Sequence, residues 1–347
     1  MFNKFLGKFS KDLGIDLGTT STLVYTPEKG IVINEPSVVA VNLRTDEIVA
    51  VGMEAKKMLG KTPAHIQVIK PLVDGVISDF EVTEKMLKYF IDKVHAESFT
   101  LMPRPRVVIG IPLDITEVEK KAVADAVKSA GARQVFLIEQ SMAAAIGSRL
   151  AVTEPTATMM VDIGGGTTEI AVISLAGVVT WKTLRLAGNA LDSDIIQYVR
   201  EEFNILIGEQ VAEEIKIKIG SAVALKEAME MPLRGRDLIN GLPKEVLISD
   251  SQVRDAMSRI IRQIIENIKL TLETTPPELV ADIYEHGIVL AGGGALLRGL
   301  DKEIAQATKI PVRIADDPLT CVVRGTGILL ANPELLAKVI SPISQEF

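Results

Sequence analysis

The sequence has almost no cysteine, few histidines and few aromatic residues, and each scarcity excludes a class of protein. Its one cysteine, Cys321, cannot form a disulfide within the chain. The three histidines, His65, His95 and His286, are scattered and lack a carboxylate cluster, which argues against a zinc site. Aromatic residues make up 4% of the chain, the formal net charge is -7 and no basic run occurs. Nucleic acid is therefore not expected as a partner.

A long uncharged hydrophobic run is also missing. Hydrophobic residues reach 47% of the chain, yet no stretch of about 18 apolar residues runs without a charge, so we expect no membrane-spanning helix. Near the amino terminus Lys4, Lys8 and Lys11 interrupt the apolar core that a secretory signal would need. The expected location is the cytoplasm.

The hydrophobic pattern is typical of an α/β fold. At 347 residues the chain suits two domains of about 150 residues each. Runs rich in valine and isoleucine at 106–111 and 135–138 predict strands, and the stretch 116–131 between them predicts a helix. A capping box formed by Thr116 and Glu119 marks the start of that helix.

An internal repeat divides the chain. Segments 15–25 and 161–172 share a strand, an aspartate, a glycine turn, a pair of threonines and a second strand. A duplicated hairpin predicts two homologous halves, with a boundary at Glu154 and Pro155. The expected domains are 1–153 with 330–347 returning to it, and 154–329, with insertions at about 34–75 in the first and about 188–254 in the second.

The repeated turns have the chemistry of phosphate binding. A turn of the form Asp-x-Gly-Thr-Thr presents several backbone N–H groups, and glycine lets a phosphate approach the backbone closely. Asp16 and Asp162 would repel a phosphate, so bridging Mg²⁺ or its waters is the role that suits them. Either loop alone is more simply an ordinary tight hairpin, whereas the matched pair favours phosphate binding.

A third glycine-rich turn follows the strand-like run at 288–291. Gly292, Gly293 and Gly294 lead from this run toward a predicted helix, and such a turn permits flat, close contact with a nucleotide. Alone it is a weak signal, since many α/β folds carry one. Neither a Walker lysine motif nor a GxGxxG motif occurs, which excludes two other nucleotide-binding folds.

With these loops and several further segments, the sequence resembles the actin, Hsp70 and sugar kinase superfamily and, within it, the bacterial actins of the MreB type. The further segments are 34–39, 60–63, 74–77, 142–147, 275–279 and 317–320. The resemblance implies an actin-like ATPase fold of two homologous RNase H-like halves, each with an inserted smaller subdomain, and a nucleotide cleft between the halves.

The resemblance also implies a function. It is that of a cytoskeletal protein that binds ATP and Mg²⁺, polymerises into antiparallel double filaments on the inner face of the plasma membrane, and organises cell-wall synthesis and rod shape. The implied partners are further copies of the chain and cell-wall elongation proteins such as MreC, MreD and RodZ-type adaptors.

The same resemblance assigns residues to the site. Glu213 and Lys216 match the helix that holds the ribose and adenine, and Gly292, Gly293 and Gly294 match the loop on the adenosine side. The implied phosphate-binding residues are Gly18, Thr19 and Thr20 in the first loop and Gly164, Gly165, Gly166, Thr167 and Thr168 in the second. Asp16, Gln140, Asp162 and Thr167 are the implied hydrolytic residues.

One departure from the family falls on the hydrolytic step. Gln140 lies where the family has a glutamate that orients or deprotonates the attacking water. An amide cannot be a general base, although it can position a water by hydrogen bonds. We therefore expect slower ATP turnover than in relatives, with assembly retained.

Two segments are candidates for membrane contact. On a helical wheel Leu13 and the apolar residues before it fall in one arc opposite the three lysines, which predicts an interfacial helix. The second candidate is the loop 98–103, which in the family inserts into membranes, although burial in the protein is nearly as compatible with its sequence. The proposed lipid-contacting residues are Phe2, Phe5, Leu6, Phe9, Phe99, Leu101 and Met102.

Two other functions use the same fold. A small-molecule kinase would need a substrate pocket with a base facing the γ-phosphate, and only the hydrolytic segment offers anything of that kind. An Hsp70-like chaperone would add a large peptide-binding domain, for which the sequence leaves no room before Phe347. Polymerisation is the expected activity, and a kinase or another non-polymerising ATPase is the alternative.

Overall fold

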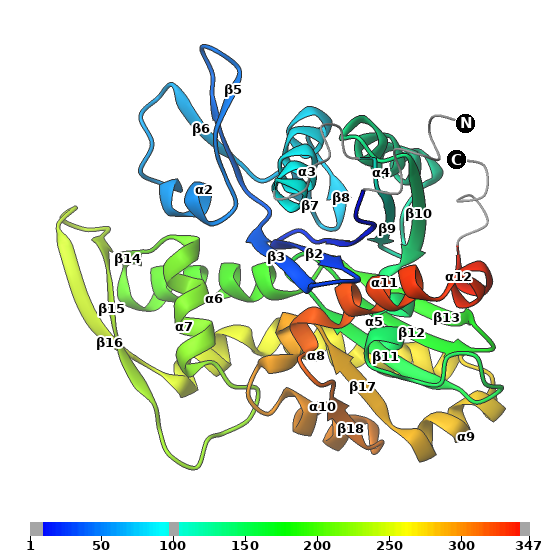
Figure 1. Cartoon of the computed structure of the whole chain (residues 1–347). Helices are drawn as coiled ribbons and strands as arrows, with labels where there is room; N and C mark the ends of the chain where they lie inside the picture. Colours follow the sequence, from blue (N-terminus) through cyan, green and yellow to red (C-terminus); the bar gives the residue numbers. More distant parts are fainter. Residues whose placement is uncertain (1–9, 97–103, 341–347) are drawn as a thin grey trace. The chain divides into compact units, whose positions relative to one another are not determined.

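The computed structural model describes residues 10–96 and 104–340, which fall into two compact units (Figure 1). The first unit runs to Pro155 and also contains 173–178 and the chain from Leu319 onward. The second unit contains 156–172 and 179–318. The chain thus returns to the first unit at Leu319, earlier than the residue 330 that the sequence suggested.

The first unit is built on a five-stranded sheet of order β10-β9-β1-β2-β3. Strands β1, β9 and β10 are parallel, while β2 pairs antiparallel with β1 and with β3. The sheet strands are β1 (Leu13–Leu17), β2 (Ser21–Thr26), β3 (Gly30–Pro36), β9 (Arg106–Ile111) and β10 (Gln134–Glu139). The helices are α2 (Met53–Met58), α3 (Phe80–His95), α4 (Glu117–Ser129), α5 (Gln140–Gly147), α11 (Cys321–Ala331) and α12 (Pro333–Val339).

The predicted elements around this sheet are confirmed. The predicted strands at 106–111 and 135–138 are β9 and part of β10. Helix α4 begins at the capping box, where the Thr116 hydroxyl accepts from the Glu119 N–H and the Glu119 carboxylate accepts from the Thr116 N–H. Because β9 lies between two parallel strands, nearly all its residues are buried, and it reads as a continuous hydrophobic run.

Two shorter sheets complete the first unit. One has the order β5-β4-β6, with strands β4 (Val39–Asn42), β5 (Glu47–Val51) and β6 (Ile66–Ile69). It forms a small core of its own around Val38, Ala40 and Ala55, the last from α2. The other is the hairpin of β7 (Leu72–Val73) and β8 (Val76–Ile77).

The second unit repeats the plan of the first. Its five-stranded sheet has the order β13-β12-β11-β17-β18, in which β11, β17 and β18 are parallel. The strands are β11 (Thr158–Ile163), β12 (Thr168–Ser174), β13 (Gly177–Leu184), β17 (Ile288–Ala291) and β18 (Val312–Ile314). They occupy the same places as β1, β2, β3, β9 and β10, so the duplicated hairpin belongs to a duplicated sheet, as expected for an actin-like fold.

Helices and a smaller sheet surround this second sheet. The helices are α6 (Gly188–Phe203), α7 (Glu209–Ile219), α8 (Asp250–Thr274), α9 (Pro277–His286) and α10 (Leu300–Thr308), with short 3₁₀ turns η2 (Gly293–Leu296) and η3 (Pro318–Thr320). The smaller sheet has the order β14-β15-β16, from β14 (Ile205–Leu206), β15 (Glu230–Asp237) and β16 (Pro243–Ser249). Its buried residues Ile205, Leu233 and Ile248 join the main core of the unit rather than forming a separate one.

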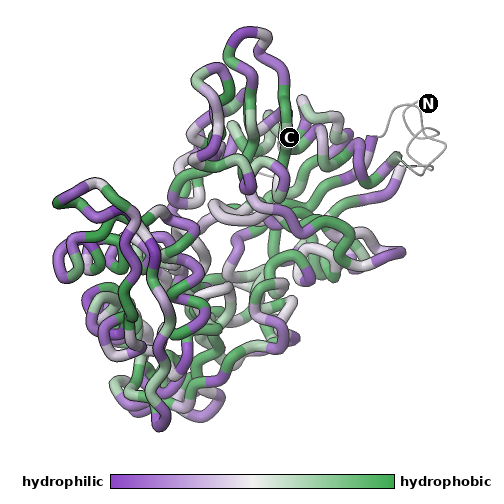
Figure 2. Tube along the Cα trace, turned by 90° about the vertical axis from the view of Figure 1, so that its left-hand side faces the viewer, coloured by the Kyte–Doolittle hydropathy of each residue, from purple (hydrophilic) through white to green (hydrophobic). Residues whose placement is uncertain are grey.

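Hydrophobic residues concentrate in the interior strands and on the covered helix faces of each unit, while many outer turns are hydrophilic (Figure 2). In the first unit Ile15 and Ile109 of the sheet pack with Phe90 of α3 and Val127 of α4. None of the helices within the described residues is long and apolar enough to cross a bilayer.

One expectation about the amino terminus is wrong. Leu13 was placed on the apolar arc of an interfacial helix, but it is the first residue of β1 and is fully buried in the sheet. Its register with Val107 of β9 gives it a partner in the core. The apolar arc therefore cannot extend as far as residue 13.

Candidate functional site

The first glycine loop connects β1 and β2, and Ser37 hydrogen-bonds to two of its carbonyl groups. The loop closes when the Gly18 N–H donates to the Ser21 carbonyl at 3.1 Å. The Ser37 hydroxyl then donates to the Gly18 carbonyl at 2.6 Å, and the Ser37 N–H donates to the Thr20 carbonyl at 3.0 Å. Ser37 is fully buried, so these bonds are shielded from water.

These bonds set the direction of the loop's amide groups. In a planar trans peptide the N–H points opposite to the preceding carbonyl. Because the Gly18 and Thr20 carbonyls point toward Ser37, the N–H groups of Thr19 and Ser21 point away from it. The Thr19 hydroxyl accepts from the Gly75 N–H at 2.8 Å, which leaves its own hydrogen available to donate.

Asp16 and Gln140 lie on the same face of the first sheet. Asp16 on β1 is in register with Gly110 on β9, and residues paired in this way share a face and stand one strand spacing apart, about 4.8 Å. A side chain at Gly110 would meet the Gln140 side chain, since an added Cβ would lie 3.1 Å from Gln140 Cγ. The structure thus brings together two residues that the sequence assigned to hydrolysis.

Gln140 is fixed by the packing of α5. It is the first residue of that helix and is buried, and the preceding Glu139 is half-buried. Burial raises the pKa of the Glu139 carboxyl, and the charge of Lys120 opposes this change. Glu139 was not among the predicted site residues, although its position next to Gln140 could have suggested it.

Helix α11 supports α5 through two glycines. A Cβ on Gly147 would lie 1.9 Å from the Cys321 carbonyl oxygen, and a Cβ on Gly325 would lie 1.9 Å from the Ala143 carbonyl oxygen. The two helix backbones therefore pack in direct contact, which only glycine permits at these positions. This contact explains why the chain returns to the first unit before residue 330.

The second glycine loop connects β11 and β12, and backbone N–H groups at the start of α6 donate to two of its carbonyl groups. The Gly164 N–H donates to the Thr167 carbonyl at 2.9 Å and closes the loop. The Gly188 N–H donates to the Gly164 carbonyl at 3.1 Å, and the Asn189 N–H donates to the Gly165 carbonyl at 2.8 Å. By the same peptide geometry, the N–H groups of Gly165 and Gly166 point away from α6.

Thr168 has a supporting position rather than an outward-facing one. Its side chain is fully buried, and its hydroxyl donates to the Leu186 carbonyl at 2.7 Å. Since a hydroxyl has one hydrogen to donate, this bond uses it within the protein. Of the two threonines in the predicted second loop, Thr167 is the one that remains next to the outward amides.

Asp162 is buried at the end of β11. Its burial raises the pKa of the carboxyl to about 7. The neighbouring Gly292 has a φ of 76°, and a Cβ there would lie 2.4 Å from Asp162 Oδ1 and 2.3 Å from the Ile163 carbonyl oxygen. The third glycine loop therefore packs directly against the base of the second.

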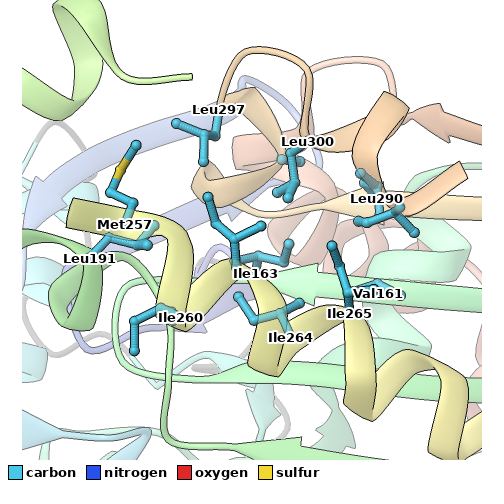
Figure 3. Close-up of a cluster of buried hydrophobic side chains, with 14 of the residues drawn as sticks. Val161, Ile163, Leu191, Met257, Ile260, Ile264, Ile265, Leu290, Leu297 and Leu300 are labelled. Carbon is cyan, nitrogen blue, oxygen red and sulfur yellow. The ribbon is translucent and has the colours of Figure 1, made fainter. Parts of the chain in front are cut away.

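The same packing continues through the third loop. A Cβ on Gly294 would lie 2.2 Å from Ile163 Cγ2, and Ile163 points into the core formed by α8, Leu297 and Leu300 (Figure 3). The loop enters the 3₁₀ turn η2 before α10 begins at Leu300. The direct passage from glycines into an α-helix that the sequence suggested is therefore wrong, and Gly292 and Gly294 are required by close packing within the unit.

Helix α7 carries the two residues assigned to the ribose and adenine. The Lys216 ammonium donates to the Gly188 carbonyl and to Asp192, both at 2.9 Å. Glu213 is half-buried, and its charge contributes to raising the pKa of Asp192. Lys216 thus contacts the start of α6, behind the second glycine loop.

The two aspartates proposed for magnesium belong to different units. Asp16 belongs to the first unit and Asp162 to the second. No group of three His, Cys, Asp or Glu side chains within 10–96 and 104–340 could hold a metal ion by itself. The proposed lipid-contacting residues, Phe2, Phe5, Leu6, Phe9, Phe99, Leu101 and Met102, lie outside the described residues.

Comparison with known proteins agrees with this architecture. A family model described as MreB/Mbl protein matches residues 10–338. The chain is 51% identical over 333 residues to the cell shape-determining protein MreB of Escherichia coli strain K12, which covers 94% of this chain and 95% of that protein.

Two solved structures are also similar. One is MreB5 of Spiroplasma citri bound to ADP, with a TM-score of 0.89, 38% identity, and 95% and 97% of the two chains covered. The same protein has been solved bound to AMPPNP. The other is the MamK double helical filament, with a TM-score of 0.78, 25% identity, and 92% and 98% covered.

Proposed function

The chain belongs to the MreB/Mbl family, and from this premise we propose that it is a cytoskeletal protein that binds ATP, polymerises at the membrane and determines cell shape by organising cell-wall synthesis. The cell-shape part of this role is supported by a relative that shares 51% of its residues and is a cell shape-determining protein.

The direction of the loop amides carries the proposal of nucleotide binding. In both glycine loops two carbonyls accept hydrogen bonds, from Ser37 in one loop and from the start of α6 in the other. The amide hydrogens of the same peptides therefore point away from these donors. Outward amides and a nearby threonine hydroxyl suit the oxygens of a phosphate chain. MreB5, which has the same fold, binds ADP and AMPPNP, and these are the ligands that such loops would hold.

A magnesium ion fits the carboxylates of this site. Asp162 is a buried carboxyl whose pKa is raised to about 7, so a cation nearby would favour its charged form. We propose that the ion arrives with the phosphates, and that Asp162 beside the second loop and Asp16 beside the first are each placed to bind its waters. When bound, Mg²⁺ would neutralise charge on the phosphates.

The hydrolytic role falls to Gln140 and its surroundings. The amide of Gln140 lies on the same sheet face as Asp16 and can orient a water by hydrogen bonds, but it cannot take the proton. We propose that turnover is slow for this reason. Assembly depends on nucleotide binding rather than on this step, so it is retained.

Self-association is supported by the fold. MamK, which forms a double helical filament, shares this fold along nearly the whole chain. We propose that this chain also forms filaments of paired, antiparallel strands. Cell-wall elongation proteins such as MreC, MreD and RodZ-type adaptors are the proposed further partners.

Membrane attachment is supported by the residues that flank the two candidate segments. Ser10 directly follows segment 1–9, and Arg104 directly follows segment 97–103. The Ser10 hydroxyl accepts from the Arg104 N–H at 2.9 Å and lies 3.4 Å from Nε2 of His95. Both segments therefore join the first unit at one place, as a single lipid-contacting surface on the inner face of the plasma membrane requires. Weak contacts of this kind add up when many copies polymerise.

The test is co-sedimentation with anionic liposomes, with and without Mg·ATP, followed by electron microscopy of the pellet. We expect filaments on the liposomes with nucleotide. Replacing Phe2 and Leu6 together by serine is expected to release the filaments, whereas Leu43→Ser, which alters an exposed apolar residue elsewhere in the first unit, is expected to change nothing.

The same experiment separates the alternative function. A chain that stays monomeric at high concentration with ATP, and that transfers phosphate to a small metabolite, would be a kinase on the same fold. A chain that forms filaments but ignores liposomes would keep the cytoskeletal role and lose the membrane part of the proposal.

A further inference from the structure

Asp192 lies one turn into α6, and it contacts Lys216, whose ammonium donates to a carbonyl in the first turn of that helix. Lys216 Nζ is 2.9 Å from the Gly188 carbonyl oxygen and 2.9 Å from Asp192 Oδ2. The Asp192 and Lys216 side chains are only 10% and 17% exposed. Asp192 Oδ1 is also 2.9 Å from the ammonium, but at an angle that makes no hydrogen bond.

The ammonium connects α7 to the start of α6. Gly188 packs closely against both neighbours, since an added Cβ would lie 3.3 Å from the Gly164 oxygen and 3.4 Å from Lys216 Nζ. The Gly188 and Asn189 N–H groups are the donors that hold the second glycine loop. The peptide between Gly188 and Asn189 therefore bonds to Lys216 through its carbonyl and to the loop through its N–H, so a shift of Lys216 would move the donor that holds the loop.

Asp192 fixes the position of the Lys216 ammonium. A buried ammonium needs a partner of opposite charge, and the Asp192 carboxylate supplies it, with both of its oxygens 2.9 Å from Lys216 Nζ. Burial raises the pKa of Asp192, and the charge of Lys216 opposes that change. The two side chains therefore depend on each other.

We propose that Asp192 is a positioning residue: it holds Lys216 against the Gly188 carbonyl and so keeps the start of α6 bonded to the second glycine loop. This inference deepens the proposed function, on which its link to nucleotide binding rests. It assigns Lys216 an action on the phosphate-binding loop, through the protein, in addition to the contact with ribose and adenine that the family resemblance implies.

Amide hydrogen exchange tests the positioning without any nucleotide. In Asp192→Asn and in Lys216→Met we expect the Gly188 and Asn189 amides to exchange at least about tenfold faster, a loss of about 1.4 kcal/mol of protection. The first glycine loop, in the other unit, is expected to keep its rates. Lys216→Arg keeps the cation and is expected to keep most of the protection.

Two matched controls accompany these variants. Lys218→Met removes an exposed lysine from the same helix, where it pairs with Glu214. Asp194→Asn removes a carboxylate from the same turn of α6, where it pairs with Arg259. Neither residue contacts Gly188 or Lys216 in the structure's hydrogen bonds and ion pairs, and neither variant is expected to change exchange at Gly188.

Binding of Mg·ADP then tests the link to function. We expect Asp192→Asn and Lys216→Met each to weaken it about tenfold, and the double variant to be no weaker than Lys216→Met, because the two side chains act as one unit. Unchanged exchange at Gly188 in Asp192→Asn, or additive losses in the double variant, would overturn the positioning role. If the unaltered chain binds no adenine nucleotide, the proposed function fails, while the exchange rates still decide whether Asp192 positions the loop.

Discussion

The hydroxyl of Ser37 lies 2.6 Å from the carbonyl oxygen of Gly18 and 2.9 Å from the hydroxyl of Thr22. Ser37 directly follows β3, whose last residue pairs with the first residue of β2, and its fully buried side chain thus reaches the turn between β1 and β2. The turn depends on this residue for its shape, although Ser37 itself does not lie in the loop.

Ser37→Ala is expected to weaken both folding and nucleotide binding. It leaves the partly buried Gly18 carbonyl without this donor, which costs about 1–3 kcal/mol, and the peptide that directs the Thr19 amide loses its anchor. Chemical denaturation and Mg·ADP titration measure the two effects. Ser251→Ala, at an exposed serine, serves as the control, and equal behaviour of the two variants would contradict the role given to Ser37.

Gln140→Glu is expected to speed ATP turnover by at least about tenfold, because a carboxylate can accept the proton that the amide cannot. Phosphate release measured at equal polymer mass tests this. Gln134→Glu places the same charge at an exposed position on β10, the strand that leads into α5, and it should leave the rate unchanged. No gain in Gln140→Glu would show that Gln140 does not limit turnover.

Asp162→Asn is expected to stabilise the nucleotide-free protein at pH 8 but hardly at pH 4. The pKa of Asp162 is about 7 in the folded chain, against a usual 3.8. Below the usual value both states hold the proton; as the pH rises toward 7 only the unfolded state releases it, so the folded state loses stability. The loss is on the order of 4 kcal/mol and is complete above the folded pKa.

Denaturation in the presence of a chelator at several pH values measures this difference. The free energy of unfolding of the asparagine variant should depend less on pH than that of the unaltered chain. Asp255→Asn, at an exposed carboxyl on α8, should keep the original dependence. Identical curves for Asp162→Asn and the unaltered chain would mean that Asp162 is not held in a desolvated position.

Gly325→Ala is expected to destabilise the first unit by about 1–3 kcal/mol. Alanine is intrinsically better than glycine inside a helix by about 1 kcal/mol, but the added Cβ would lie 1.9 Å from the Ala143 oxygen, so α5 and α11 would have to separate. Thermal unfolding measures the result. Gly177→Ala, whose Cβ would meet only an ordinary contact at 3.8 Å, should cost nothing, and a stabilised Gly325→Ala would contradict the close packing.

The local features of this fold were predictable from sequence, and the long-range ones were not. The hairpins around Asp16 and Asp162 and the capping box at Thr116 follow from residues within a few positions of each other. The bonds of Ser37 to the first loop and of Asp192 to Lys216 join residues that no local period connects. The sequence therefore did not predict Ser37 or Asp192 as site residues.

The wrong expectations have the same origin. Leu13 satisfied a helical wheel, but its register with Val107 belongs to the sheet. The glycines at 292–294 suggested a direct passage into an α-helix, whereas the chain first forms the 3₁₀ turn η2, with Gly292 and Gly294 packed against Ile163. In both cases a tertiary contact decided the conformation over a pattern that was locally satisfied.

The packing of α11 on α5 also sets an order of events during synthesis. The second unit ends at Pro318, before α11 has been translated, whereas the first unit lacks this helix until the ribosome has passed Ala331. Since domains fold as their chains emerge, the unit that is begun first is finished last. The face of α5 that carries Gly147 therefore stays uncovered in the nascent protein until α11 has been made.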